Sequence, residues 1–574
     1  MASKVRYTPG KDGLNIEALK NYSQSNSSEK PAQWRELFLV WVLSTLVLLV
    51  FLPNILDKLN PVTGDEPFYL VTAISLLQDH DINEANNYAN HDYWQFSPSC
   101  QEMSQPDWGM VGEIPIKNVP GVLAPGLRDD CDIKSLPLKA LSTLPPHNSK
   151  GVIRPGMYTK HGLGLSFLIA PAYALGNRPM VVVFIIALTA LLGVNLWLLA
   201  FEITGKRRVA WITWLIMQFS APLLCFAFLI FPATPAALFL IYSWRRIRLS
   251  VLAQKQGFSE WQPNGPFRAF LIGSSLALLP WLHSLYLSLS IMLFLYWWWG
   301  GRSVLRTLWQ KVVRKETLAW PAIGPAGWSP LAVAWLLVPL ILSGALFCSY
   351  YLYYYGSPLP NTQDHAGFAQ PTEIPFGLMG LLFDQKYGLL VYCPLYLLAL
   401  SGLWLLWQRK SDPAETNVRR NDLTWIALVS LPYLLIIADY NQWWGEWCPP
   451  ARYLVPILPL LAVPLAMALT ELNGKFFKAF LGVAGLWTLA ASALFMYNPH
   501  LMYNWQTAKP AVSILWLEAN FDFLTNFHLA RLVPSYVTNL DINGKQANWL
   551  AALIWLAAAV LVSLWLINSR REEY

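Results

Sequence analysis

The sequence predicts an all-α protein that crosses a membrane many times. Of its 574 residues, 55% are hydrophobic and only 13% are charged, whereas about 25% of the residues of an ordinary soluble domain are charged. Apolar runs long enough to cross a hydrocarbon core recur along the chain, and Lys and Arg gather in a few short connectors. This distribution of the net charge of +7 indicates membrane orientation and excludes a nucleic-acid surface.

The N-terminal segment, residues 1–36, is polar and basic. It lacks the apolar run near Met1 that a cleavable signal peptide contains, so we expect this tail to stay in the cytoplasm. The next apolar run predicts the first membrane helix at 37–56. A polar stretch, 57–178, follows as a large extracytoplasmic loop with interfacial helices, and a helix-like segment at 67–78 opens it.

The later apolar runs predict the remaining membrane helices. They lie within 179–497 and 549–574, at about 180–201, 209–230, 232–244, 268–281, 283–299, 331–354, 388–407, 423–438, 453–470, 479–497 and 549–567. The segment 158–175 is ambiguous. Counted as a span, it would place the basic clusters 206–208 and 245–248 outside, whereas an interfacial or re-entrant helix keeps them in the cytoplasm. The positive-inside rule therefore favours about twelve spans, with both termini cytoplasmic.

This topology gathers most of the remaining polar residues on one outer face. The segments concerned are 57–178, 356–387, 439–452 and 498–548. Asp65 and Glu66 form a carboxylate pair just past the first span, and ionisable groups at the lip of a bilayer are a functional-site hypothesis by default. An ordinary helix start is the alternative, because Asp is a good N-cap and Pro67 suits the first turn of a helix.

Four short motifs follow one another on these outer loops. They are Gly64-Asp65-Glu66-Pro67, Tyr158-Thr159-Lys160-His161-Gly162-Leu163-Gly164, Phe383-Asp384-Gln385-Lys386-Tyr387-Gly388, and Trp443-Trp444-Gly445-Glu446-Trp447 leading to Arg452. Their sequence and order resemble the bacterial GT-C superfamily of membrane glycosyltransferases, in the group of the protein mannosyltransferases and aminoarabinose transferases. The resemblance covers about 64–459 and implies a GT-C-like fold.

The resemblance also implies a reaction. A sugar would pass, with inversion, from a polyprenyl-phosphate carrier to a glycan, lipid or protein acceptor at the outer face of the bacterial inner membrane. Asp65 occupies the family's catalytic position, with Glu66 as the neighbouring candidate. A carboxylate there would take the proton of the attacking acceptor hydroxyl, as a general base.

Other residues would bind the substrates. The outer-face cations available for the lipid phosphate are Lys160, His161, Lys386 and Arg452. Gly162 and Gly164 would let the backbone approach the phosphate closely. The remaining candidates are Asp384, Tyr387, Trp444 and Glu446. Gln385 and Glu446 depart from the family pattern, where Pro and Gly are usual, which indicates an atypical sugar pocket.

Each candidate also has a structural interpretation. Lys160 and Lys386 can extend from helix ends to the lipid headgroups, and a single His such as His161 is more often a hydrogen-bonded interfacial residue than a catalyst. Asp384 can cap a turn or pair with Lys386. Arg452 begins a predicted span, where its charge needs a partner, and that partner can be a phosphate, Glu446 or Asp439.

The sequence offers weaker evidence for a metal site or a disulfide than for the four motifs. Asp79, His80, Asp81, Glu84, His91 and Asp92 offer enough ligands for a divalent cation, but their spacing matches no known metal motif. A solvated acidic loop is the favoured interpretation, and a divalent cation stays an open alternative. Cys100 and Cys131 lie in the first outer loop, where an oxidising compartment would permit a disulfide between them.

Two further function classes share these features. A transporter or flippase of lipid-linked saccharides would also need outward charges and aromatic residues. It should place charges along a pathway at the membrane midplane, however, and the apolar runs carry almost none. A scaffold that keeps a GT-C fold without activity is the second alternative, because fold does not fix function.

Overall fold

The structure is a computed structural model. It describes residues 30–59, 62, 64–96, 149, 151–255, 265–299, 328–360, 374–408, 410, 412–440, 442–445, 447–504, 510–521, 524, 529–536 and 545–568. All helices and turns given below fall in these ranges, and no β-strand element occurs in them. The fold is therefore all-α over the part of the chain that is described.

Six described helices are long and apolar enough to cross a membrane. They are α2 (Lys30–Lys58), α5 (Leu163–Thr204), α12 (Pro330–Tyr355), α16 (Pro413–Ala438), α18 (Lys475–Tyr497) and α22 (Lys545–Asn568). Their length and composition make this a membrane protein. The predicted total of about twelve spans is not shown by these six helices and stays a prediction.

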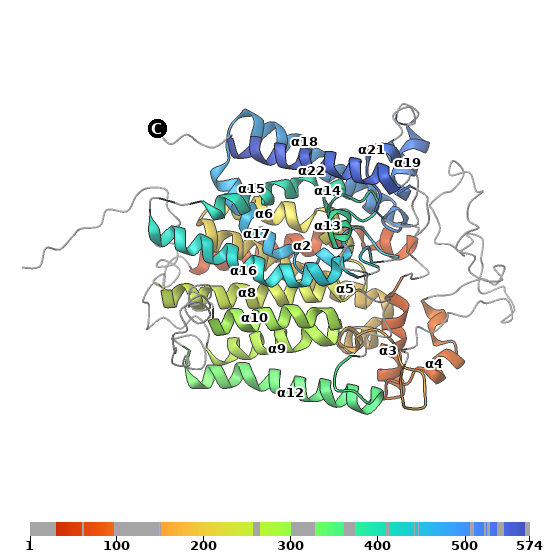
Figure 1. Ribbon diagram of the computed structural model, residues 1–574. Coiled ribbons are helices and arrows are strands. Elements are labelled where there is room, and N and C mark those ends of the chain that lie inside the picture. The colour runs from red at the N-terminus through yellow and green to blue at the C-terminus, as the bar shows by residue number, and fades with distance from the viewer. Residues whose placement is uncertain are drawn as a thin grey trace, which may run out of the picture.

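Further helices, all but α8 shorter than these six, fill the rest of the bundle. They are α6 (Arg207–Gln218), α7 (Ala221–Phe226), α8 (Ala233–Lys255), α9 (Pro266–Leu282), α10 (Leu287–Trp299), α13 (Ile374–Phe383), α14 (Leu389–Tyr392), α15 (Leu397–Trp407) and α17 (Ala462–Glu471). Short 3₁₀ turns join some of them: η5 (Ser284–Tyr286), η8 (Pro394–Tyr396), η9 (Arg452–Leu454) and η10 (Leu458–Leu461). In Figure 1, α8, α9, α10, α12 and α16 run side by side.

Three predicted spans are not single helices. The run 209–230 forms α6 and α7, the run 388–407 forms α14, η8 and α15, and the run 453–470 lies in η9, η10 and α17. Pro222, Pro394 and Pro459 each stand in the first turn of a new helix. Proline lacks the N–H that would continue the preceding helix, so hydropathy alone made these runs look continuous.

Ion pairs join the helices at one end of the bundle, which we call the basic end. Arg207 of α6 lies 3.5 Å from Glu36 of α2. Arg245 of α8 lies 3.2 Å from Glu202 of α5, and Arg248 makes two hydrogen bonds, of 2.7 and 2.8 Å, to the carboxylate of Asp422 of α16. Arg207 is exposed, whereas Arg245 and Arg248 are buried, and all three belong to the clusters that the positive-inside rule placed together.

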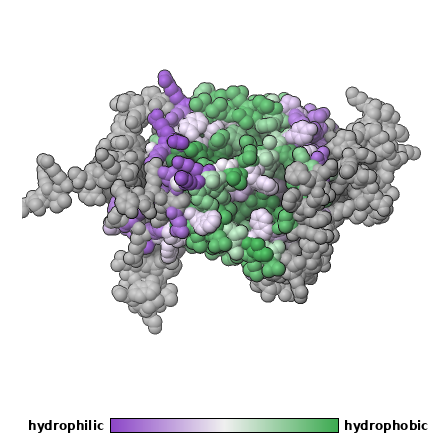
Figure 2. Space-filling model, turned by 90° about the horizontal axis from the view of Figure 1, so that it is seen from above, coloured by the Kyte–Doolittle hydropathy of each residue, from purple (hydrophilic) through white to green (hydrophobic). Residues whose placement is uncertain are grey.

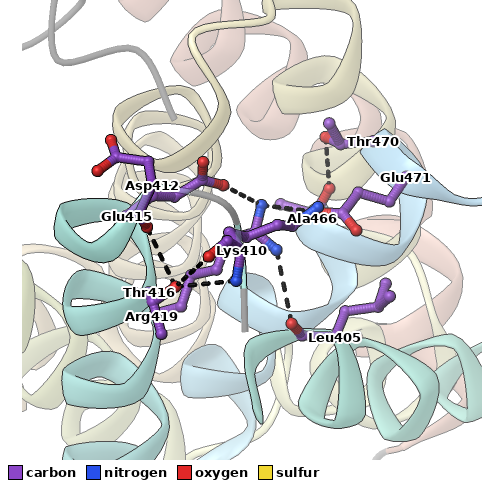
Figure 3. Close-up of polar contacts among 9 residues, drawn as sticks. All are labelled: Leu405, Lys410, Asp412, Glu415, Thr416, Arg419, Ala466, Thr470 and Glu471. Carbon is purple, nitrogen blue, oxygen red and sulfur yellow. Dashed lines mark hydrogen bonds and ion pairs between the residues drawn. The ribbon is translucent and has the colours of Figure 1, made fainter. Parts of the chain in front are cut away.

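A second group of charges closes the same end. Figure 3 shows Arg419 of α16 between Glu415, at 2.5 Å, and Glu471 of α17, at 2.6 Å. The ammonium of Lys410 lies 3.2 Å from Glu471. Glu471 forms ion pairs with both Arg419 and Lys410. These pairs hold together the start of α16, the end of α17 and the segment after α15.

The polar elements of the first outer loop lie at the opposite end. They are α3 (Glu66–Gln78), α4 (Ala85–Ala89) and η1 (Asp92–Gln95), and Figure 1 shows α3 and α4 at the end away from the chain's C-terminus. In Figure 2, hydrophobic residues cover the middle of the visible face and hydrophilic ones gather toward its ends. An apolar band between polar ends is the pattern of a protein that crosses a bilayer.

Helix α5 is broken about a third of the way along its length. Gly176 has an extended backbone and Asn177 has φ 53° and ψ −153°, so two helices meet there. The shorter first part begins against the C-terminal end of α9, and Arg178, just past the break, lies beside Leu56 at the end of α2. Both ends of the first part are thus at the polar-loop end. The predicted interfacial segment 158–175 runs along that end of the bundle and does not pass through it.

Candidate active site

A cavity opens at the polar-loop end, which we call the cavity end. Its walls come from the start of α3, the segment before α5, the end of α9 with η5, the end of α12, and the chain around 440–453. Polar and aromatic residues line it, among them Asp65, Lys160, His161, His283, Tyr350, Tyr355, Tyr440, Gln442 and Arg452. Two of the four sequence motifs therefore contribute charged side chains to the cavity, together with the Arg452 to which the fourth leads.

Asp65 reaches the cavity from a tight turn before α3. Gly64 has φ +67°, and a Cβ on it would lie 2.8 Å from the carbonyl oxygen of Trp447. Only glycine accepts that conformation and that approach without strain. Asp65 is the N-cap residue of α3, but its side chain makes no capping hydrogen bond. The carboxylate therefore does not cap α3.

The partner of the Asp65 carboxylate is Arg452. Nη2 of Arg452 donates to Oδ2 of Asp65, and Nη1 donates to the carbonyl oxygen of Gly445 at 2.9 Å. The guanidinium also lies 4.6 Å from the centre of the Phe231 ring. Arg452 therefore has a protein carboxylate as partner, which is neither the Asp439 nor the phosphate weighed from the sequence. Glu446 lies outside the described residues.

Glu66 lies behind Asp65 and away from the cavity. It is only 2% exposed and is absent from the cavity lining. Burial raises the pKa of its carboxyl to about 7, and the charge of Arg178 opposes this rise. Two adjacent carboxylates thus occupy different environments, one paired at the cavity and one buried, which is a common way to divide roles between two acids.

Lys160 and His161 form another part of the wall. Lys160 is exposed at the cavity, and no described residue forms an ion pair with it. The ring of His161 stacks on Phe68, with centroids 5.5 Å apart, and lies 5.1 Å from Tyr69. These aromatic contacts fix the ring of His161 against α3.

Gly162 and Gly164 have a packing role that the sequence did not reveal. A Cβ on Gly162 would lie 2.5 Å from the carbonyl oxygens of Trp281 and Leu282, and one on Gly164 would lie 2.7 Å from the carbonyl carbon of Trp281. The glycines let the start of α5 pack against the end of α9. This packing contact explains why both positions are glycine, so a phosphate-binding role is not needed to explain them.

The third motif lies apart from the cavity lining. Oδ1 of Asp384 accepts the backbone N–H groups of Lys386 at 2.8 Å and Tyr387 at 3.0 Å, and Oδ2 accepts that of Tyr536 at 2.7 Å. Burial raises the pKa of Asp384 and lowers that of Lys386 to about 8. The carbonyl of Tyr387 accepts the N–H of Ala451 at 2.9 Å. The motif therefore holds the backbone of Ala451, the residue before Arg452, through this hydrogen bond.

The other predicted site residues fall outside the cavity or outside the description. Trp444 packs edge-on against Trp443, with ring centroids 5.7 Å apart, and is not part of the cavity lining. Cys100 and Cys131 lie outside the described residues, so their pairing stays a prediction.

The acidic stretch after α3 forms internal hydrogen bonds. The side-chain amide of Asn87 donates to Asp79 and to Asp92, each at 2.9 Å. Glu84 is buried against Thr72, and burial raises its pKa to about 8. Asp79, His80 and Asp81 are exposed, as a solvated loop predicts, whereas Glu84 and Asn87 are buried. In the described ranges, no group of three or more His, Cys, Asp or Glu gathers to hold a metal ion, and the divalent cation stays an open alternative.

Sequence reasoning missed the aromatic wall of the cavity. Tyr350, Tyr351 and Tyr355 of α12 line it together with Trp281 and His283. The hydroxyl of Tyr355 donates to Ser149 at 2.8 Å. A run of five tyrosines within 350–355 was the available signal, but tyrosine is also typical of the membrane interface, so the run alone does not indicate a cavity.

Comparisons with models of protein families, with characterised proteins and with solved structures found no match to this chain. The case for a function therefore rests on the motifs and on the geometry of the cavity.

Proposed function

We propose that this protein is a membrane glycosyltransferase of GT-C type that transfers a sugar from a polyprenyl-phosphate carrier to an acceptor at the extracytoplasmic face. The observation that carries the proposal is the placement of Asp65 at a cavity, beside Arg452 and within a wall that also holds Lys160. A base, cations and aromatic side chains at one end of an apolar bundle are what such a transfer requires.

In the proposed step, the acceptor hydroxyl oxygen attacks the anomeric carbon of the donor sugar. The bond between that carbon and the phosphate oxygen breaks, its electron pair leaves with the polyprenyl phosphate, and the configuration inverts. Asp65 takes the proton of the hydroxyl. Arg452 holds one oxygen of this carboxylate, so it aims the base toward the cavity.

The donor phosphate would bind chiefly to Lys160. Both terminal nitrogens of Arg452 are engaged by Asp65 and Gly445, whereas Lys160 lies exposed at the cavity. The tyrosine side chains at the end of α12 offer ring faces and hydroxyls for sugar recognition. The break in α5 keeps the 163–175 segment at the same end, where a lipid-linked donor would enter from the bilayer.

The test is a transfer assay with the purified protein in lipid vesicles. A panel of polyprenyl-phosphate sugars is offered, and release of the polyprenyl phosphate is measured together with sugar incorporation into glycan, lipid and peptide acceptors. The proposal expects both products with one member of the panel, and a weaker donor affinity in Lys160→Gln. Donor that crosses the vesicle membrane unchanged, with no release of polyprenyl phosphate, would identify a flippase instead.

A further inference from the structure

Arg178 is a buried charge for which the proposed reaction has no use. Its side chain is in the bundle, with 8% of the residue exposed, and it does not line the cavity. A buried guanidinium is costly unless other groups compensate it. Its contacts therefore indicate what it holds in place.

Arg178 contacts the connection that carries Asp65 at its α2 arm. Nη1 of Arg178 donates to the carbonyl oxygen of Leu56 at 3.5 Å, near the end of α2. The chain from Leu56 to Glu66, the first residue of α3, contains the Gly64 turn and Asp65. Arg178 therefore anchors the start of that connection, and its charge also lowers the pKa of Glu66 at the far end.

The backbone next to Arg178 is strained. Asn177 combines φ 53° with ψ −153°, a region that residues other than glycine rarely adopt. Its own side chain is exposed, so packing of that side chain does not account for the conformation. The conformation breaks α5, and Arg178, the first residue after the break, is buried. Strain of this kind persists where the surrounding structure needs the resulting geometry.

We propose that Arg178 is a positioning residue, which holds the connection between α2 and α3 so that Asp65 meets Arg452 at the cavity. The inference rests on the proposed function only for its catalytic meaning; the positioning itself is a property of the fold. Without Arg178, the Leu56 carbonyl at the end of α2 would lose its buried donor, and Asp65 would move away from Arg452.

The position of residue 65 can be measured without any transfer activity. In a chain whose six cysteines are replaced, Asp65→Cys places a single thiol beside Arg452. A neighbouring guanidinium lowers the pKa of a thiol below its usual value of about 8.5. The rate of alkylation by iodoacetamide, followed from pH 5 to pH 10, gives that pKa.

Adding Arg178→Gln should return the thiol pKa toward its usual value and slow alkylation at pH 7 by roughly tenfold, because less thiolate is present. Arg178→Lys, which keeps the charge but loses the planar fork, should give a partial shift. Arg245→Gln is the matched control: it removes an equally buried Arg at the basic end, and it should leave the thiol pKa unchanged even where it lowers the melting temperature.

An unchanged thiol pKa in Arg178→Gln overturns the proposal, as does an equal shift in Arg245→Gln. If Arg178→Gln does not accumulate, Arg178→Lys decides: no shift in that variant also overturns it. In the transfer assay, a positioning role lowers kcat and leaves the donor KM unchanged. Should no donor react with the wild type, the proposed function fails while the thiol measurement still stands.

Discussion

Of two neighbouring carboxylates, only one has a step in the proposed reaction. Asp65 faces the cavity and is paired with Arg452, whereas Glu66 is buried, with a pKa raised to about 7 by desolvation. The motif favoured Asp65 as the base and kept Glu66 as the neighbouring candidate, because adjacent acids have nearly the same local sequence. The direction in which each side chain points makes the distinction.

Asp65→Asn should fold normally and lower turnover by a factor on the order of 10² to 10⁴, the usual contribution of a positioned general base. Sugar transfer is measured in vesicles, with melting temperature as the check on folding. Glu66→Gln is the comparison, and it should keep much more activity because Glu66 does not reach the cavity. A variant Asp65→Asn with full turnover would remove Asp65 from the reaction.

Arg452→Lys keeps the charge but cannot hold both Asp65 and the Gly445 carbonyl, since the planar fork is lost. If Arg452 orients the base, kcat falls and the donor KM stays nearly constant. A rise in the donor KM at constant kcat would show instead that Arg452 binds the donor phosphate. Steady-state kinetics over a range of donor concentrations separates the two outcomes.

Glu66 should make stability depend on pH. Its pKa is about 4.5 when unfolded and about 7 when folded, because desolvation and the charge of Asp65 raise it more than Arg178 and Tyr503 lower it. A raised pKa favours the neutral form, so its contribution to stability is complete below pH 4.5 and declines as the pH rises to about 7. Glu66→Gln should flatten the melting-temperature profile over this window. A profile identical to that of the wild type would contradict the assignment.

At the scale of elements, the close contact between α5 and α9 shapes the cavity wall. Gly162 and Gly164 allow the start of α5 to reach the carbonyl groups at the end of α9, and the break at Asn177 ends the same segment beside α2. The 163–175 segment is thus fixed at both ends, which keeps Lys160 and His161 against the cavity.

Gly162→Ala should be destabilising because its Cβ would overlap two backbone carbonyls at 2.5 Å, and backbone cannot move as a flexible side chain can. Overpacking of this kind costs about 1–3 kcal/mol. Gly482→Ala in α18 is the control, since no atom lies within 4 Å of its added Cβ; it should leave stability equal or slightly higher. Equal melting temperatures for both variants would contradict the contact.

The sequence predicts the positions of the long helices better than it predicts contacts between distant residues. Apolar runs and charge clusters are local signals, so long helices such as α12 and α18 could be located from the sequence. The pairing of Asp65 with Arg452 could not, because 387 positions separate them and any of several acids could have met the arginine. For Asp384 the sequence left a substrate role and a turn cap both open, and the structure confirms the cap, because Oδ1 accepts the backbone N–H groups of Lys386 and Tyr387.

The whole molecule has two polar ends of different kinds. The basic end is closed by ion pairs such as Arg248 with Asp422 and Arg419 with Glu471, whereas the other end holds the cavity. The helix α2 starts near the basic end, where Glu36 meets Arg207, and α22 ends there too, with Trp565 against Phe476. The placement of both termini on the cytoplasmic side of the membrane stays a prediction.

Single-cysteine labelling with an impermeant reagent tests the orientation, on a background without native cysteines. Ser149→Cys and Asn177→Cys should both react from outside, because both positions lie at the cavity end. Lys206→Cys, at the basic end, should react only after the membrane is permeabilised. If Asn177→Cys also needs permeabilisation, the 158–175 segment crosses the membrane and the predicted topology is wrong.

The distance along the chain between Asp65 and Arg452 has a consequence for biosynthesis. The 387 positions between them take roughly 20 to 80 s to translate at about 5–20 residues per second. During that interval the first helices are already made, but Arg452, the partner of the Asp65 carboxylate, is not. The reaction centre is therefore completed only late in translation, and a ribosome that stops before residue 452 releases a product without it.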